Sequence, residues 1–304
     1  MTLAIPPSPS VRVVRAVDAK VRAAARDGRL ERLRCGSYVD SIAWRGLDRD
    51  VRTRAFVFEA ARRRPRPLLV SHVSAAALWG LPLVGRRIDA VDSLRFTVSG
   101  GRSEATLRAH RSSLRCQPDV IDGVEVTPLA RTLVDVARTE SLVTSVCALD
   151  AALVAGLVTR GEVLAELGRH GRARGCARAR EALAVASPGS TTPLESLSCV
   201  RMHEARLERP EQQVELPAIE PGASFFVDFA WSAHRLLGEA DGDGKYGSDV
   251  PTSVAAVLAE KDRENHLRGL GHDMVRWDWE TAWRPAGLEH RLLRRGVRVL
   301  GPWA

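Results

Sequence analysis

The strongest constraint on the fold of this chain is a pair of short strand-like runs in its last third. Residues 225–231 and 235–241 are rich in apolar side chains and are separated by a tight turn. A loop of either two or four residues places Asp228 opposite Glu239, whereas a three-residue loop would shift the register. We therefore predict an antiparallel hairpin in which these two acids face each other.

The acids on this predicted hairpin indicate a metal site. Directly opposed residues on neighbouring strands have Cβ atoms about 4.5–5.5 Å apart, so Asp228 and Glu239 repel unless a cation or a proton lies between them. Asp241 lies two residues further along and shares their face, which Phe226 and Leu237 make otherwise apolar. Hard oxygen ligands at this density are typical of Mg²⁺ or Mn²⁺. We predict that Asp228, Glu239 and Asp241 bind such an ion.

The elements around the hairpin predict a mixed α/β unit. A helix begins after Thr192, and Glu195 at its third position fits either a capping box or an acid directed at the hairpin. A second helix is expected at 254–270 and a closing strand at 274–279. The order helix, strand, strand, helix, strand is that of a mixed sheet flanked by helices. The Ser-, Gly- and Pro-rich loop at 187–192 marks its start.

The charge of the chain predicts a polyanionic partner. The net charge is +8 and the pI is about 9.9, which favours nucleic acid, although a solvated basic face would give the same balance. Only three of the 45 basic residues are lysines, namely Lys20, Lys245 and Lys261. Lysine can release its proton when it is desolvated, which arginine does not. Lys245 follows the acids closely and is therefore a candidate catalytic residue.

The first forty residues predict a small DNA-binding unit. Valines at helical spacing from Val11 to Val21 indicate a helix that ends at Gly28, and two short strands are expected at 30–33 and 37–39. A helix followed by a basic hairpin is the core of a winged helix, although an ordinary amphipathic helix with a hairpin has the same pattern. The candidate phosphate-binding residues are Arg22, Arg26, Arg29, Arg32 and Arg34.

The remainder of the chain sets the fold class and excludes several functions. Residues 50–140 alternate helical and strand-like pieces, and 140–185 are helical, so we predict an α/β (α+β) protein with domains at 1–186 and 187–304. No apolar run reaches the roughly 18 residues of a membrane span, and no signal peptide is recognisable, which predicts a cytoplasmic protein. The five scattered cysteines, with no CxxC, argue against a disulfide framework or a zinc finger. No phosphate-binding glycine loop is present.

Residues 193–279, together with the loop before them, resemble the DUF559 group of restriction-endonuclease-like domains. These are relatives of the very-short-patch repair endonucleases and carry the PD-(D/E)XK pattern. The matching segments are SPGSTTPLES, VDFAW, LLGEADGDGKY, AEKDRENHLRGLG and VRWDW. The resemblance implies that Asp228 and Glu239 are the metal-binding acids, that Glu195 is the helical acid, and that Lys245 is the electrostatic or acid–base lysine.

One position departs from the wider PD-(D/E)XK pattern. That pattern places lysine two residues after the second acid, where this chain has Asp241. Lys245 or Lys261 would then have to supply the amine, and if neither reaches the acids the domain binds DNA without cutting it. Further candidate DNA-binding residues in this region are Lys261, Arg263 and Arg276.

The N-terminal part is similar, over shorter segments, to the AbiEi-type antitoxin and transcriptional-regulator group. The segments are GRLERLRCGSYV, VSHVSAAALWGLP and VTPLARTLVDVAR. This similarity implies a degenerate winged helix followed by a small α/β region. The resulting hypothesis is a Mg²⁺- or Mn²⁺-dependent endodeoxyribonuclease. The alternatives are a transcriptional regulator or type IV antitoxin that binds DNA with an inactive nuclease fold, and a protein that neutralises a toxin by direct contact.

Overall fold

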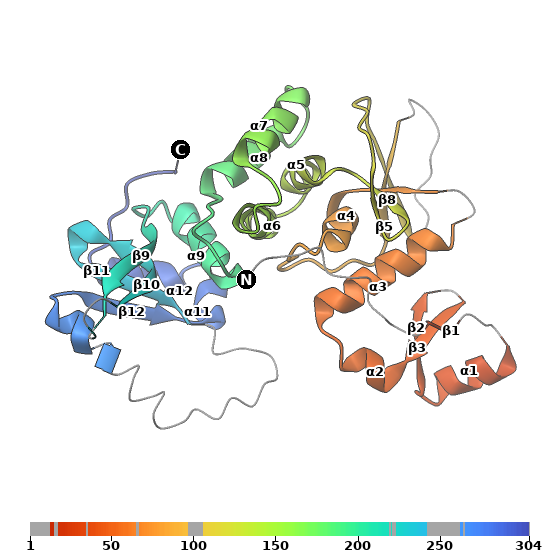
Figure 1. Ribbon diagram of the computed structural model, residues 1–304, viewed down its shortest axis with the longest axis horizontal. Helices are drawn as coiled ribbons and strands as arrows, with labels where there is room; N and C mark the ends of the chain where they lie inside the picture. The colour runs from red at the N-terminus through yellow and green to blue at the C-terminus, as the bar shows by residue number, and fades with distance from the viewer. Residues whose placement is uncertain are drawn as a thin grey trace. The chain divides into compact units, whose positions relative to one another are not determined.

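The chain folds into two compact units, which are drawn in Figure 1. The computed structural model describes residues 13–14, 18–34, 36–64, 67–96, 106–218, 220, 223–241, 262–263 and 265–303. The first unit comprises residues 1–148 and 155–179, and the second comprises 149–154 and 180–304. The predicted boundary at residue 187 lies inside the second unit. Helices and mixed sheets occur in both units, which confirms the α/β (α+β) class.

The first unit begins with a small antiparallel sheet in the order β1-β3-β2. Its strands are β1 (Val13–Val14), β2 (Leu30–Arg34) and β3 (Ser37–Asp40). The prediction of a helix from Val11 is wrong at Val13–Val14, because β-branched valines favour a pleated strand. Helix α1 (Ala19–Arg26) starts only after Asp18, whose side chain accepts a hydrogen bond from the Val21 amide at 2.8 Å. Helices α2 (Ser41–Arg45) and α3 (Arg49–Arg62) follow.

A five-stranded sheet in the order β6-β5-β4-β8-β7 forms the centre of the first unit. Its strands are β4 (Leu69–Val70), β5 (Val91–Arg95), β6 (Leu107–Arg111), β7 (Asp119–Ile121) and β8 (Val124–Val126). Helix α4 packs against α5, and α5 packs against α7. The helices in this region are α4 (His72–Leu78), α5 (Leu129–Thr139), α6 (Leu142–Val154), α7 (Arg160–Arg169) and α8 (Cys176–Val185).

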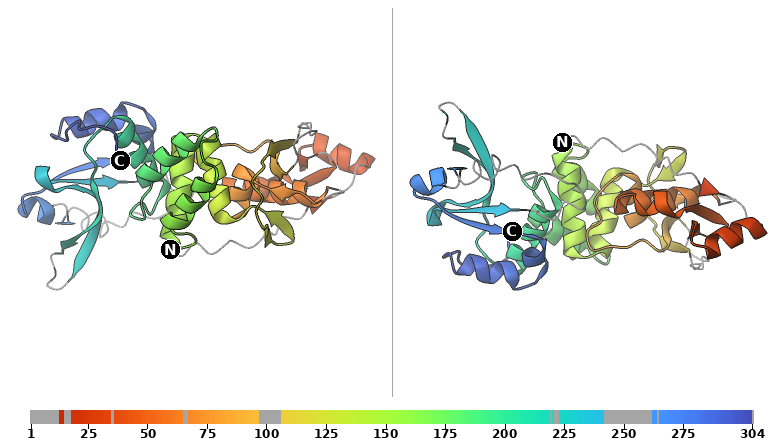
Figure 2. Two further views of the ribbon diagram at one scale, coloured as in Figure 1. Left: turned by 90° about the horizontal axis from the view of Figure 1, so that it is seen from above. Right: turned by 90° about the horizontal axis from the view of Figure 1, so that it is seen from below.

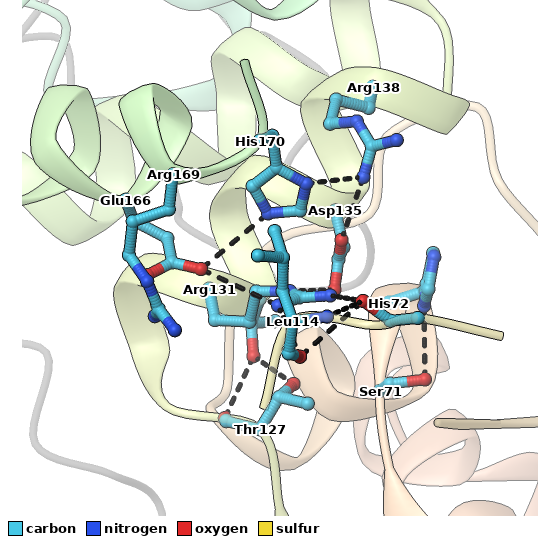
Figure 3. Close-up of polar contacts among 12 residues, drawn as sticks. Ser71, His72, Leu114, Thr127, Arg131, Asp135, Arg138, Glu166, Arg169 and His170 are labelled. Carbon is cyan, nitrogen blue, oxygen red and sulfur yellow. Dashed lines mark hydrogen bonds and ion pairs between the residues drawn. The ribbon is translucent and has the colours of Figure 1, made fainter. Parts of the chain in front are cut away.

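A buried ionic network joins α5 to the end of α7, as Figure 3 shows. The Arg131 side chain is only 2% exposed; it donates to Asp135 Oδ2 at 2.8 Å and lies 3.6 Å from Glu166 Oε1. Arg138 Nη1 lies 2.9 Å from His170 Nδ1. Burial lowers the pKa of His170, so its ring stays neutral and can accept this bond. The two helices are therefore held by polar contacts as well as by apolar packing.

The second unit is built on a four-stranded sheet in the order β12-β11-β10-β9. Strand β10 is antiparallel to both its neighbours, and β11 is parallel to β12. The strands are β9 (Glu211–Pro217), β10 (Ser224–Trp231), β11 (Leu236–Ala240) and β12 (Asp273–Trp277). The helices are α9 (Pro193–Glu204), α11 (Trp279–Trp283) and α12 (Gly287–Leu293).

The hairpin of β10 and β11 has the predicted register. Trp231 pairs with Leu236 across a four-residue connection that contains a 3₁₀ turn at 232–234. The predicted strand at 274–279 ends earlier, because the Asp278 side chain accepts from the Thr281 amide at 2.8 Å and starts α11. Strand β9 was not predicted, since its sequence is polar and ends in proline. Of the predicted helix at 254–270, the structure describes 262–263 and 265–270, and all of these but 270 are helical.

The two faces of this sheet are covered by different helices. On one face Phe229 stacks on Trp277, whose Nε1 donates to Ser198 of α9 at 2.7 Å; Figure 2 shows the C-terminal helices, in dark blue, along one side of the sheet. On the other face Leu267 packs with Leu237 in an apolar cluster. Among the described residues, no helix is both long enough and apolar enough to cross a bilayer.

Gly238 should be intolerant of a side chain. A Cβ at this position would lie 2.7 Å from Cη2 of Trp277 and 3.1 Å from Cζ3 of Trp231. We expect Gly238→Ala to lower the free energy of unfolding by about 1–3 kcal/mol through overpacking, measured by urea denaturation followed by circular dichroism. A Cβ added at Gly168 in α7 would have no neighbouring heavy atom within 4 Å. Gly168→Ala should therefore raise the free energy of unfolding by about 0.5–1 kcal/mol. Equal effects of the two changes would contradict the packing described.

Asp135 should be essential to the buried network. Asp135→Asn removes the carboxylate closest to the buried Arg131 guanidinium, and loss of one partner of a buried ion pair costs about 3–5 kcal/mol. The same denaturation experiment measures the loss. Asp119→Asn, at an exposed position on β7, should change stability by less than about 0.5 kcal/mol. A similarly small effect at Asp135 would show that Arg131 does not depend on it.

Candidate active site

Three of the predicted acids gather at the β10–β11 hairpin. The paired register runs from Trp231 with Leu236 to Phe229 with Gly238, and Asp228 on β10 and Glu239 on β11 directly follow this last pair. Asp228 Oδ2 accepts from the Ala240 amide at 2.9 Å, so its carboxylate reaches across to the neighbouring strand. Glu195 at the start of α9 belongs to the same group, because burial and, to a smaller extent, the nearby charge of Asp228 raise the pKa of its carboxyl.

The alternation of strand β10 is interrupted at Asp228. In a regular strand Val227 and Ala230 would lie on opposite faces, yet both belong to the apolar cluster that contains Leu237. Phe226, which was predicted to share the face of Leu237, is instead 56% exposed. The prediction of a regular apolar face around the acids is therefore wrong at Phe226.

Glu195 combines a capping role with a place in the acid group. Its side chain is buried; it accepts from the Thr191 amide at 2.8 Å and from the Thr192 hydroxyl at 2.7 Å. The Thr192 hydroxyl also accepts from the Glu195 amide, as an N-cap does. Oε2 of Glu195 accepts in addition from Gln213. The capping role and the position beside the acids of the hairpin, which were alternatives in the sequence, are thus compatible at Glu195.

Gln213 links two of the acids and was not predicted from the sequence. Its Nε2 lies 3.3 Å from Glu195 Oε2 and 3.4 Å from Asp228 Oδ1. The backbone φ of Gln213 is 50°, in the left-handed region that non-glycine residues rarely adopt. Such strain is retained where the surroundings impose it, often at functional sites. No spacing rule identifies this residue, because β9 itself has no clear strand pattern.

Two arginines neutralise the third acid. Arg263 and Arg276 both form ion pairs with Glu239, and Arg276 Nη2 lies 2.9 Å from its Oε2. Arg276 Nη1 lies 3.2 Å from Asp241, so Asp241 is held at the edge of the group. The Arg263 guanidinium also lies over the Phe225 ring, 4.8 Å from its centroid. These predicted DNA-binding arginines are therefore adjacent to the acids.

Burial perturbs the titration of all three central acids. It raises the pKa of Glu195, Asp228 and Glu239 above the usual range of carboxyl groups. At Asp228 the hydrogen bonds from Ala240 and Gln213 oppose this rise, and at Glu239 the two arginines oppose it. Half-buried carboxylates whose pKa values are raised in a group are characteristic of functional sites. A bound cation would favour their ionised forms.

Asp228 and Glu239 are the candidate residues for holding a divalent cation. Within the described residues, no group of three or more His, Cys, Asp or Glu side chains is arranged to hold a metal ion. Magnesium, however, is commonly bound by one or two carboxylates, with water and substrate phosphate as the other ligands. Asp228 and Glu239 provide such a pair. Lys245 and Lys261 lie outside the described residues.

The predicted N-terminal arginines have different environments. Arg22, Arg26 and Arg32 are exposed on α1 and β2. Arg29 pairs with Asp27 at 3.1 Å, also at the surface. Arg34 is half-buried and donates to the Ala60 carbonyl of α3 at 3.0 Å, so its role there is structural.

Gln213→Ala should raise the pKa of Asp228. The amide donates to the ionised carboxylate, and its loss removes stabilisation of the charged form while burial and the repulsion from Asp241 remain. We expect the ¹³C carboxyl resonances of the acid pair to titrate at higher pH than in the wild type. Gln212→Ala is the matched control, since Gln212 donates instead to Ser190 at 2.8 Å. Identical titration curves for Gln213→Ala and the wild type would contradict a role in positioning the acids.

Comparisons of this chain with models of known families, with curated proteins and with solved structures found no match. The inference of function therefore rests on the residues and on the geometry described above.

Proposed function

We propose that this protein is a DNA endonuclease that depends on Mg²⁺ or Mn²⁺. The observation that carries the proposal is the set of acids on α9, β10 and β11, buried at Glu195 and Glu239 and partly buried at Asp228, with Gln213 between two of them and two arginines on the third. Buried carboxylates that lie close together cost stability unless charged or hydrogen-bonding partners offset their repulsion and desolvation. The resemblance of residues 193–279 to the DUF559 group points to the same chemistry, and the net charge of +8 favours a nucleic-acid substrate.

In this proposal the residues of the site have separate roles in binding the ion, orienting the acids and contacting phosphate. Asp228 and Glu239 would hold the divalent ion, which when bound supplies a Lewis acid for activating water and neutralising phosphate. Gln213 orients the Asp228 carboxylate through the contact at 3.4 Å and connects it to Glu195. Arg263 and Arg276 keep Glu239 ionised, and the remaining N–H groups of their guanidinium forks can donate to phosphate oxygens.

Asp228→Asn tests the proposal directly. The full chain is incubated with supercoiled plasmid and with linear DNA in Mg²⁺ or Mn²⁺, and nicking is measured on gels. We expect cleavage that EDTA abolishes and that Asp228→Asn reduces by about 100-fold or more, since loss even of outer-shell partners of a metal costs about 10–100-fold. Asn keeps the size of the side chain and removes its charge.

Two results would contradict the nuclease. One is the absence of cleavage on any DNA substrate with either metal. The other is cleavage that persists unchanged in Asp228→Asn, which indicates a contaminating nuclease. Asp119→Asn, at an exposed position on β7, is the control that should leave the rate unchanged.

A second candidate function is supported by the start of the first unit. Helix α1 carries exposed Arg22 and Arg26 beside the sheet of β1, β3 and β2. A helix with a basic face can contact DNA phosphates without cutting the strand. On this hypothesis the protein is a DNA-binding regulator of the antitoxin type. Sequence-specific, salt-dependent binding to the promoter of its own gene, lost in Arg22→Ala/Arg26→Ala, would favour it over the nuclease if cleavage is absent.

A further inference from the structure

Helix α12 presents a group of basic side chains around an open pocket in the second unit. The pocket has a volume of about 400 Å³. Its lining residues are Gly287, His290, Arg291, Arg294 and Arg295. The four ionisable residues among them are all exposed to solvent, and no acidic side chain lines the pocket. This chemistry suits an anion.

Two of these arginines are anchored by the edge strand β12. Arg291 donates to the Arg276 carbonyl, and Arg295 donates to the Met274 carbonyl at 3.3 Å and pairs with Asp273. Anchored guanidinium groups lose less conformational entropy when they bind an anion than free side chains do. Asp273 offsets part of the Arg295 charge, whereas the Arg291 bond to a neutral carbonyl leaves the positive charge of Arg291 in place.

Arg294 completes the pocket from the end of α12. Its side chain forms no hydrogen bond or ion pair with the residues that the structure describes, so its five N–H donors can face a ligand. A cation at a helix C-terminus is also favoured by the helix dipole alone. A role in binding is therefore distinguished from a role in capping only by experiment.

Strand β12 connects this pocket to the candidate active site. Arg276 accepts from Arg291 through its carbonyl and pairs with Glu239 through its side chain. A polyanion with regularly spaced phosphates offers separate anionic groups to the pocket and to the arginines beside Glu239. We propose that the α12 pocket binds a backbone phosphodiester of the DNA strand that enters the carboxylate site. This inference rests on the proposed function for its substrate, but it concerns binding and not the cleavage step.

DNA binding by the full chain tests the pocket separately from catalysis. The affinity for a fluorescein-labelled duplex is measured by anisotropy, with Ca²⁺ in place of Mg²⁺, over a range of salt concentrations. We expect Arg294→Glu to raise Kd about tenfold and to reduce the slope of log K against log salt by about 1, as loss of a phosphate contact does. Arg294→Ala should act in the same direction with a smaller effect.

Arg87→Glu is the matched control, because it makes the same change in net charge at an exposed position of the first unit. If Arg294→Glu and Arg87→Glu raise Kd equally, the effect is one of general charge and the inference is overturned. Circular dichroism shows whether the Arg294 variants keep their fold. Arg294 is exposed, so we expect unchanged spectra.

The outcomes separate this inference from the proposed function. If the wild type never cuts DNA but Arg294→Glu selectively weakens DNA binding, the nuclease hypothesis is wrong and the proposed phosphate contact of the pocket is supported. If the wild type cuts DNA and Arg294→Glu changes neither Kd nor KM, the proposed phosphate contact is wrong and the nuclease hypothesis is supported. Inorganic phosphate at constant ionic strength should compete only weakly. Strong, Arg294-dependent binding of phosphate with unaltered DNA affinity would identify a free-phosphate site and overturn the inference.

Discussion

The register of the β10–β11 hairpin is the constraint on which the second unit depends. Pairing of Trp231 with Leu236 places Gly238 beside the ring of Trp277, where no side chain fits. The same register brings Asp228 and Glu239 to the end of the paired segment, next to Phe229 and Gly238. A slip of one residue would exchange the buried and exposed positions of the strand and would also separate the acids. The stability of the sheet and the geometry of the candidate active site therefore have a common origin.

The balance of charge around the acids explains how they can be half-buried. Three carboxylates in one place would repel each other, and burial further disfavours their ionised forms. The chain compensates with an amide from Gln213 and with guanidinium groups from Arg263 and Arg276. The ion pairs of Arg276 with both Glu239 and Asp241 join the two acids of β11 to the neighbouring strand β12.

The sequence predicts the hairpin and its acids well, because strand register follows from the pattern of side chains and the length of the turn. It predicts Gln213 poorly, because the amide reaches the acids only through a left-handed backbone at a position of β9. The prediction of a helix is wrong at Val13–Val14, which forms a strand. The three-residue spacing of the valines matches the period of a helix, but β-branched valine itself favours a strand. The environment of Arg34 depends on α3, which is distant in sequence, and so could not be read locally.

The central claim is that Asp228 and Glu239 together hold a divalent cation. Anomalous diffraction from crystals of the full chain soaked in Mn²⁺ tests it most directly, because the metal is located without any assumption about the substrate. We predict a single strong peak within coordination distance of both carboxylates, absent from crystals of Asp228→Asn. A peak elsewhere, or none while Arg276 still pairs with Glu239, would contradict the claim.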